Sequence, residues 1–269
     1  MTSGDDPARN LADARVMIRE AAKGGADIVL TPEVTNCVSA SRARQSEVLR
    51  PESDDLTLAG LRDEARVLGV WVLIGSIGLK TDDADGRFAN RSFLIAPDGA
   101  VAARYDKIHM FDVDIGPGER IRESDGYRPG RRAVLAETPL ARIGLTICYD
   151  MRFAHLYRRL AQAGAQVLTV PSAFHPVTGA AHWHALLRAR AIETGCFVLA
   201  PAQTGTHTAV AGRRRESYGH SLAVSPWGEV LADGGTATGV VFVDLDLADV
   251  DKARSRVPAL KHDRNFEGP

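Results

Sequence analysis

The chain has 269 residues, of which 45% are hydrophobic and 25% charged, and its formal net charge is −1. This composition is that of a globular protein with a sizeable core, and the balanced charge argues against a nucleic acid or an anionic membrane as the main partner. Three widely spaced cysteines form neither a disulfide framework nor a CxxC metal motif, and no apolar stretch reaches the length of a membrane helix. We therefore expect a cytoplasmic protein without a secretion signal.

The first third of the chain alternates helices with short apolar strands. Asp6 is a predicted N-cap with Pro7 at the first helical position, and apolar residues then recur at helical spacing up to Gly24-Gly25. Strands are predicted at DIVLTPE and VWVLIGSIG, on either side of a second helix that ends at Gly69. This alternation is typical of α/β folds.

The rest of the chain adds strand pairs and then returns to the same alternation. SFLIAP with AVAARYDK, and AVLAETP with ARIGLTIC, are predicted as antiparallel pairs. A helix over about 153–163, the strand QVLTVPS, a helix over 180–194 and the strand CFVLAPAQ follow. A hairpin around Pro226-Trp227-Gly228, a last strand GVVFVDLDL and a short helix complete the prediction. No internal repeat or linker is visible, so we expect one domain over residues 1–269.

Three residues of different chemistry each follow a predicted strand. Glu33 comes after DIVLTP, Lys107 after AVAARYD and Cys148 after RIGLTI. Because ligand sites in α/β sheets gather beyond the carboxyl ends of strands, we expect these side chains to meet. Cys148 also lies at a strand-to-helix turn, where backbone N–H groups point outward. Cys37 and Cys196 have no comparable setting, and we expect both to pack in the core.

The residues alone leave open which group activates the Cys148 thiol. A thiol nucleophile needs a base, and the chain offers eight histidines besides Glu33. A buried carboxylate is suitable when desolvation raises its pKa. Lys107 would place a positive charge where the oxygen of a tetrahedral intermediate becomes negative, and the backbone N–H of Tyr149 would be a second donor.

Three segments together resemble the nitrilase, or carbon–nitrogen hydrolase, superfamily. They are LTPE around Glu33, YDKIHMFD around Lys107 and ICYDMRF around Cys148, in that order, and the resemblance covers nearly the whole chain. It implies Cys148 as nucleophile, Glu33 as base and Lys107 as oxyanion stabiliser. The segment RESDGYRPG is similar to the one that carries a second active-site glutamate, which implies that role for Glu123. The resemblance implies neither a metal nor an organic cofactor.

The resemblance also implies an architecture, a four-layer α-β-β-α sandwich that associates as a homodimer or a higher homo-oligomer. Similar proteins open with a strand that would end about where Met1-Thr2-Ser3 stands, so we expect the sheet to lack its first strand. Ala154-His155 stands where Pro-Glu is usual, which we expect to affect the start of the next helix. His184 replaces a common acidic residue, which we expect to alter the pocket rim or the dimer contact.

The expected function is that of a cofactor-free thiol amidohydrolase acting on linear amides. The later segments resemble the subgroup that cleaves ω-amides and deaminated glutathione, which implies a small carboxylate-bearing substrate, a thioester intermediate and release of ammonia or an amine. Tyr149, Arg152, Phe174 and His175 are the candidate substrate-binding residues. Three alternatives stay open: an N-carbamoyl amide hydrolase, an amide-forming acyltransferase that uses the same thioester, and a non-catalytic scaffold or binding protein.

Overall fold

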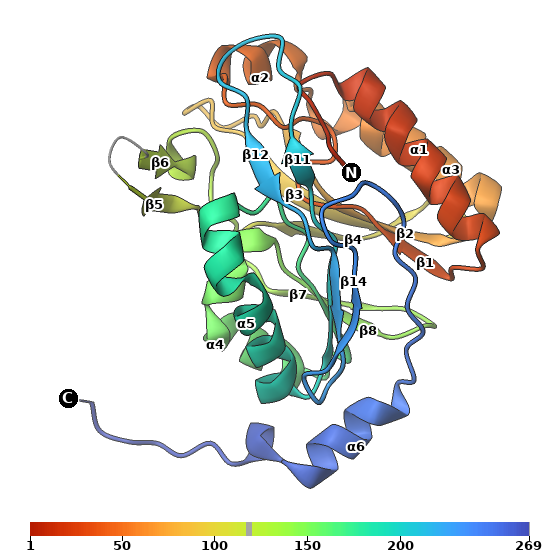
Figure 1. Cartoon of the computed structure of the whole chain (residues 1–269), viewed down its shortest axis with the longest axis vertical. Helices are drawn as coiled ribbons and strands as arrows, with labels where there is room; N and C mark the ends of the chain where they lie inside the picture. The colour runs from red at the N-terminus through yellow and green to blue at the C-terminus, as the bar shows by residue number, and fades with distance from the viewer. Residues whose placement is uncertain (117–119, 269) are drawn as a thin grey trace.

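Two β-sheets lie face to face between layers of helices in the computed structural model, which describes residues 1–116 and 120–268 (Figure 1). The first sheet contains, in spatial order, β1 (Ile28–Leu30), β2 (Trp71–Leu79), β3 (Ala89–Ile95) and β4 (Val101–Asp106). The second sheet contains β14 (Val230–Asp233), β13 (Leu222–Val224), β10 (Phe197–Ala200), β9 (Val167–Thr169), β8 (Arg142–Leu145) and β7 (Val134–Glu137).

The helices pack on the outer faces of these sheets, which gives the expected α-β-β-α arrangement. The helices α1 (Pro7–Lys23) and α3 (Leu56–Leu68) cover the first sheet, and α4 (Ala154–Gln162) and α5 (Pro176–Thr194) cover the second. The predicted start of α1 at Asp6 and the predicted end of α3 at Gly69 are both confirmed. The Asp6 carboxylate accepts hydrogen bonds from the first turn of α1, and Gly69, at φ 69°, ends α3 in the left-handed region that favours glycine.

Strand β2 shows how the sequence places one sheet between two apolar environments. Successive side chains of a strand point to opposite faces. Val72 and Ile74 pack with the apolar faces of α1 and α3, whereas Leu73 belongs to the core between the sheets. Because both faces are buried, the strand reads as a continuous apolar run, and it was predicted on that basis.

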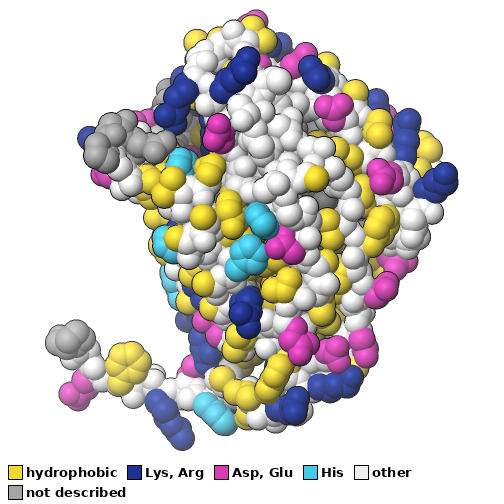
Figure 2. Space-filling view, in the orientation of Figure 1, with side chains coloured by type: hydrophobic (Ala, Val, Ile, Leu, Met, Phe, Trp, Pro, Cys, Tyr) yellow, Lys and Arg dark blue, Asp and Glu magenta, His cyan; other side chains and the backbone are white. Residues whose placement is uncertain are grey.

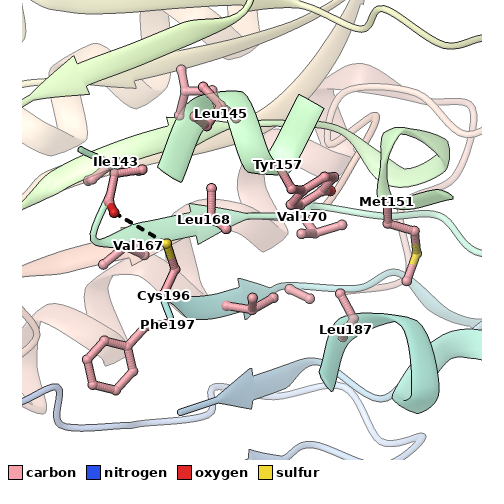
Figure 3. Close-up of a cluster of buried hydrophobic side chains, with 14 of the residues drawn as sticks. Ile143, Leu145, Met151, Tyr157, Val167, Leu168, Val170, Leu187, Cys196 and Phe197 are labelled. Carbon is pink, nitrogen blue, oxygen red and sulfur yellow. Dashed lines mark hydrogen bonds between the residues drawn. The ribbon is translucent and has the colours of Figure 1, made fainter. Parts of the chain in front are cut away.

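The core of the second sheet is formed by the strands next to the predicted nucleophile. Figure 3 shows Leu168 and Val170 between Tyr157 of α4 and Leu187 of α5, in the cluster that also contains Leu145. The same cluster contains Cys196, whose thiol donates to the backbone oxygen of Ala165 at 3.3 Å. The expected packing role of Cys196 agrees with this position. Cys37 is also buried, beside Leu49, Phe88 and Tyr127.

The prediction of a last strand over GVVFVDLDL is wrong. Residues 240–246 are not part of any strand in the described structure and lead instead to the helix α6 (Ala248–Arg256). A strand requires a neighbouring backbone, and this segment lies along a cavity of about 620 Å³ that separates it from β1. Within the described ranges, β1 pairs only with β2 and is the outermost strand of its sheet.

Several short elements were not predicted from the sequence. They are α2 (Arg42–Val48), the pair β5 (Asp112–Asp114) and β6 (Arg120–Arg122), the pair β11 (Thr204–Thr206) and β12 (Glu216–Tyr218), and short 3₁₀ turns. The helix α5 also begins at Pro176, four residues earlier than expected, with His175 as its N-cap. None of the helices within residues 1–116 and 120–268 has the length and apolarity of a membrane span.

Candidate active site

Glu33, Lys107 and Cys148 meet between the two sheets, at the ends of the strands that precede them. The strand β1 is parallel to β2, while β3 is antiparallel to both β2 and β4, so β1 and β4 end at the same edge of the first sheet. Lys107 directly follows β4 and its Nζ lies 2.8 Å from Glu33 Oε1. The Cys148 thiol, beyond β8 of the facing sheet, lies close enough to the Glu33 carboxylate for that charge to raise its pKa.

The backbone at Cys148 forms a sharp turn. Cys148 has φ 49°, in the left-handed region that residues other than glycine rarely adopt, and it opens a 3₁₀ turn over Cys148–Arg152. The buried Asp150 carboxylate fixes this turn by accepting hydrogen bonds from the backbone of Ile147 at 2.9 Å and from the Tyr105 hydroxyl at 2.6 Å. The Cys148 N–H donates to the Pro171 oxygen at 3.0 Å. These contacts hold the thiol where a regular strand or helix would not place it.

Lys107 is surrounded by carboxylates. Its side chain is only 2% exposed, and its Nζ contacts Glu33 Oε1 at 2.8 Å and the two oxygens of Glu123 at 3.0 and 2.9 Å. Burial alone would lower the pKa of Lys107, but the negative charges of Glu123 and Glu33 raise it well above its ordinary value. An ammonium group has three N–H donors, so all three are engaged. Lys107 is therefore a fixed positive charge.

From the sequence we expect desolvation to raise the pKa of Glu33, and the structure corrects this expectation. Burial does raise the pKa of Glu33, but the Lys107 charge, the Lys107 hydrogen bond and the backbone N–H of Ala173, 2.8 Å from Oε2, together outweigh burial. The net pKa lies below its usual value, so Glu33 is ionised. The sequence argument considered desolvation alone because the cation comes from a distant strand.

The pKa of the Cys148 thiol is shifted in the opposite direction, upward. Burial and the neighbouring Glu33 carboxylate raise the pKa of Cys148 well above its ordinary value, although the Lys107 charge acts in the other direction. At neutral pH the site therefore holds a neutral thiol beside an ionised carboxylate. Such a pair can transfer the thiol proton to Glu33 when sulfur forms a bond to carbon.

Asn90 is a site residue that the sequence argument missed. Its Nδ2 donates to Glu33 Oε1 at 2.9 Å and lies 3.4 Å from Glu123 Oε1. The backbone N–H of Phe111 holds the other Glu123 oxygen at 2.7 Å. Little in the sequence marks it as a site residue, because Asn90 is followed directly by two further polar residues in the strand ANRSFLI. Asn90 thus links the two carboxylates that flank Lys107.

The model of one family, described as carbon–nitrogen hydrolase, matches residues 2–255. The chain belongs to this family. It is accordingly a hydrolase that acts on the carbon–nitrogen bond of amides. The catalytic roles of Glu33, Lys107 and Cys148 that the resemblance implied stay predictions.

Relatives and solved structures resemble this hydrolase along its whole length. It is 38% identical to the deaminated glutathione amidase of Yersinia enterocolitica, over 98% of this chain and 91% of the relative, and 38% identical to that of Homo sapiens, over 98% and 80%. The crystal structure of Caenorhabditis elegans NitFhit gives a TM-score of 0.89 at 36% identity, with 98% of this chain and 63% of that chain covered. Saccharomyces cerevisiae Nit3 gives 0.84 at 27% identity, over 97% and 93%.

Three of the four candidate substrate-binding residues of the hydrolase gather near Cys148, the predicted nucleophile. The Arg152 guanidinium lies 5.7 Å from the centre of the Tyr149 ring and 5.8 Å from that of Phe174. Arg152 Nη2 also lies 3.2 Å from His182 Nδ1. His175, the fourth residue, uses its Nδ1 to accept the Val177 N–H at 3.3 Å and so caps α5. Contact of these four residues with substrate stays a prediction.

Proposed function

We propose that this hydrolase cleaves the amide of a small carboxylate-bearing molecule through a thioester on Cys148. One observation carries the proposal, namely the buried Cys148 thiol beside the buried Glu33 carboxylate that Lys107 contacts at 2.8 Å. A thiol beside a carboxylate that accepts its proton is the arrangement that nucleophilic catalysis needs. A Nesterenkonia amidase, 25% identical to this chain with a TM-score of 0.76, is described as carrying acrylamide added at its active-site cysteine.

In the first half-reaction, the Cys148 sulfur bonds to the amide carbon while the thiol proton passes to Glu33. The carbonyl π electrons move onto oxygen, which becomes an oxyanion. When the carbonyl re-forms, the carbon–nitrogen bond breaks and Glu33 returns the proton to the leaving nitrogen, which departs as ammonia or an amine. The acyl group then remains on Cys148 as a thioester.

In the second half-reaction, Glu33 takes a proton from a water molecule that attacks the thioester carbon. The carbon–sulfur bond breaks, the proton returns to sulfur, and the carboxylic acid product leaves. One carboxylate therefore serves both halves, which requires that it be ionised at the start of each. The lowered pKa of Glu33 meets that requirement.

Lys107 stabilises the oxyanion in this scheme, together with the backbone N–H of Tyr149. Because all three Lys107 N–H groups are engaged, direct donation to the oxyanion requires one of its two bonds to Glu123 to be exchanged for the substrate oxygen. Glu123 keeps its second bond to Lys107 and its bond from Phe111, so it positions the ammonium throughout. A fixed donor of this kind lowers the barrier by about 3–4 kcal/mol.

The proposed substrate carries a carboxylate that Arg152 recognises. The Arg152 guanidinium lies near the Tyr149 and Phe174 rings, close to the turn that contains Cys148. A guanidinium pairs with a carboxylate through two parallel hydrogen bonds, which fixes the orientation of a small acid. Relatives along the whole chain are named deaminated glutathione amidase, which supports an amide of that type as substrate.

The test is a screen of deaminated glutathione, ω-amides of dicarboxylic acids and N-carbamoyl compounds that measures the release of both ammonia and primary amines, combined with intact-protein mass spectrometry. We expect release from a carboxylate-bearing amide and an acyl adduct on the wild-type chain. Cys148→Ala should lose both while keeping its circular dichroism spectrum. Cys196→Ala is the matched control, because Cys196 is a buried cysteine in the core and should keep turnover.

Two outcomes would contradict the proposal. Turnover retained in Cys148→Ala would exclude this nucleophile. Hydrolysis of neutral amides at the same kcat/KM as that of their carboxylate-bearing analogues would exclude the substrate class. Addition of amines also separates hydrolysis from acyl transfer, because accumulation of a new amide at the expense of acid would assign the thioester to an acyltransferase.

A further inference from the structure

We propose a second site, a surface site for a divalent transition-metal ion of the Zn²⁺ type formed by His184, His220 and Asp233. These residues come from α5, from the segment before β13 and from the end of β14. One ligand atom from each lies within 4.8 Å of the other two. The metal in this proposal takes no part in amide hydrolysis.

The distances within this cluster are already close to those of a metal site. His184 Nε2 lies 2.9 Å from Asp233 Oδ2, and His220 Nδ1 lies 3.0 and 3.1 Å from the two carboxylate oxygens. A tetrahedral Zn²⁺ with ligand bonds of about 2.0–2.2 Å separates its donor atoms by about 3.3–3.5 Å. An ion of this size therefore matches the spacing of the donor atoms to within small rotations of the side chains.

The donor types select the class of metal. Two imidazole nitrogens and one carboxylate suit Zn²⁺, Co²⁺, Ni²⁺ or Cu²⁺, whereas Mg²⁺ and Ca²⁺ prefer shells made of oxygen. The three side chains are 36%, 24% and 32% exposed, so a metal here can keep a water molecule in its fourth position. Histidine side chains lie beside an acidic one over the middle of the face that carries α5 and β14 (Figure 2).

Contacts around the cluster hold the ligands in place. The backbone N–H of Gly235 donates to Asp233 Oδ1 at 2.9 Å, and the His220 ring stacks on Tyr218 with ring centres 4.6 Å apart. Hydrogen bonds of the His220 backbone to Gly235 and from the Trp183 indole, at 2.6 and 2.8 Å, keep it at φ 58°. Supporting contacts of this kind orient the ligands of a metal. A left-handed histidine held by two segments is unusual for an ordinary surface residue.

A bound ion would join three segments that are distant in sequence. The helix α5 would be tied to the hairpin of β13 and β14 on the outside of the second sheet. Trp183, which precedes His184, packs against Phe174 with ring centres 5.0 Å apart, so the tie lies next to the wall proposed to bind substrate. The expected role is therefore to stabilise this part of the fold.

The test is a calorimetric titration of the whole metal-free chain with ZnCl₂ in the Cys148→Ala background. That substitution removes the active-site thiol, because thiolates also bind Zn²⁺. We expect one site per chain and a rise in Tm of a few degrees on saturation. Co²⁺ should give a visible absorption spectrum without the charge-transfer band of a thiolate ligand.

Variants distinguish this site from adventitious binding. His184→Gln and Asp233→Asn, each added to the Cys148→Ala chain, should weaken Zn²⁺ binding at least about 10-fold. His182→Gln is the control on the same helix, since His182 contacts Arg152 instead, and it should bind as the parent does. Absence of binding in the parent, or equal affinity in Asp233→Asn and the parent, would overturn the proposal.

Discussion

Two clusters of three ionisable side chains differ mainly in their exposure. Lys107 with Glu33 and Glu123 lies between the sheets, whereas His184 with His220 and Asp233 lies half exposed at the surface. In the buried cluster each charge depends on its partners, because water cannot replace them. In the surface cluster water can solvate each group separately. Burial thus holds the Lys107 cluster in a single arrangement. The half-exposed His184 cluster can exchange a hydrogen bond for a bond to a ligand.

The largest expected effect comes from removing the buried cation. Lys107→Met leaves the buried Glu33 carboxylate and the partly buried Glu123 carboxylate without their shared partner, which should lower the free energy of unfolding by about 3–5 kcal/mol. We also expect kcat to fall by at least about 10²–10³-fold. Urea denaturation and steady-state kinetics measure the two effects.

An exposed lysine provides the control for this change. Lys252 contacts Asp249 at 2.8 Å on the surface of α6, so Lys252→Met should leave both stability and kcat at the values of the parent. Equal loss of stability in the two variants would show that burial does not distinguish these ion pairs.

The buried His207 makes the stability of the protein depend on pH. Burial lowers the pKa of His207 from 6.5 to about 4, and its ring contacts the Ser3 oxygen at 2.7 Å and Ser217 Oγ at 2.8 Å. Since the unfolded chain takes up this proton first, stability is complete above pH 6.5 and is lost as the pH falls towards 4. The loss reaches about 3 kcal/mol, at about 1.4 kcal/mol for each pKa unit.

The His207 prediction is checked by urea denaturation at several pH values. His207→Gln should flatten the dependence between pH 6.5 and 4 even where its overall stability is lower. His262→Gln, a change in the exposed C-terminal segment, should preserve the dependence. The same slope in His207→Gln and the parent would assign the acid sensitivity to other groups.

Asn90 tests whether the buried cluster needs its neutral member. Asn90→Ala removes the donor to Glu33 Oε1, which should allow the carboxylate to shift and reduce kcat by on the order of 10²-fold. Ser92→Ala is the matched control, because Ser92 is buried on the same strand but donates to the Ile74 oxygen. Similar kcat values for the two variants would contradict a positioning role for Asn90.

The smallest effect is expected at the surface cluster in the absence of metal. Asp233→Asn should change the free energy of unfolding by less than about 1 kcal/mol, because its partners remain partly solvated. Urea denaturation in a metal chelator measures this change. A loss as large as that of Lys107→Met would mean that the two clusters do not differ in the way their exposure indicates.

The residues that we propose as catalytic were recognisable in the sequence because local patterns mark their positions. Glu33, Lys107 and Cys148 each follow a strand that was predicted from its short apolar run or from its pairing with a neighbouring run. Asn90 was missed because it lies within a strand, where polarity alone does not indicate a role. The net pKa shift of Glu33 depends on a lysine 74 positions away, so no local pattern contains it.

Pairing between distant segments explains the other differences. The stretch GVVFVDLDL has the composition of a strand, but a strand forms only beside another backbone, and a cavity separates this segment from β1. The ligands of the proposed metal site likewise come from three segments whose meeting depends on the assembled second sheet. Composition indicates what a segment can form, and the neighbours decide which form is adopted.

At the turn that contains Cys148, the proposed reaction requires a cysteine, whereas the left-handed backbone favours a glycine. A left-handed backbone disfavours every residue with a Cβ by about 1–2 kcal/mol relative to glycine, and at φ 49° this position carries that strain. A glycine would relax it but would remove the sulfur. The residue best suited to the turn is therefore catalytically silent, and a lineage released from selection for amide hydrolysis could drift towards it while keeping its fold.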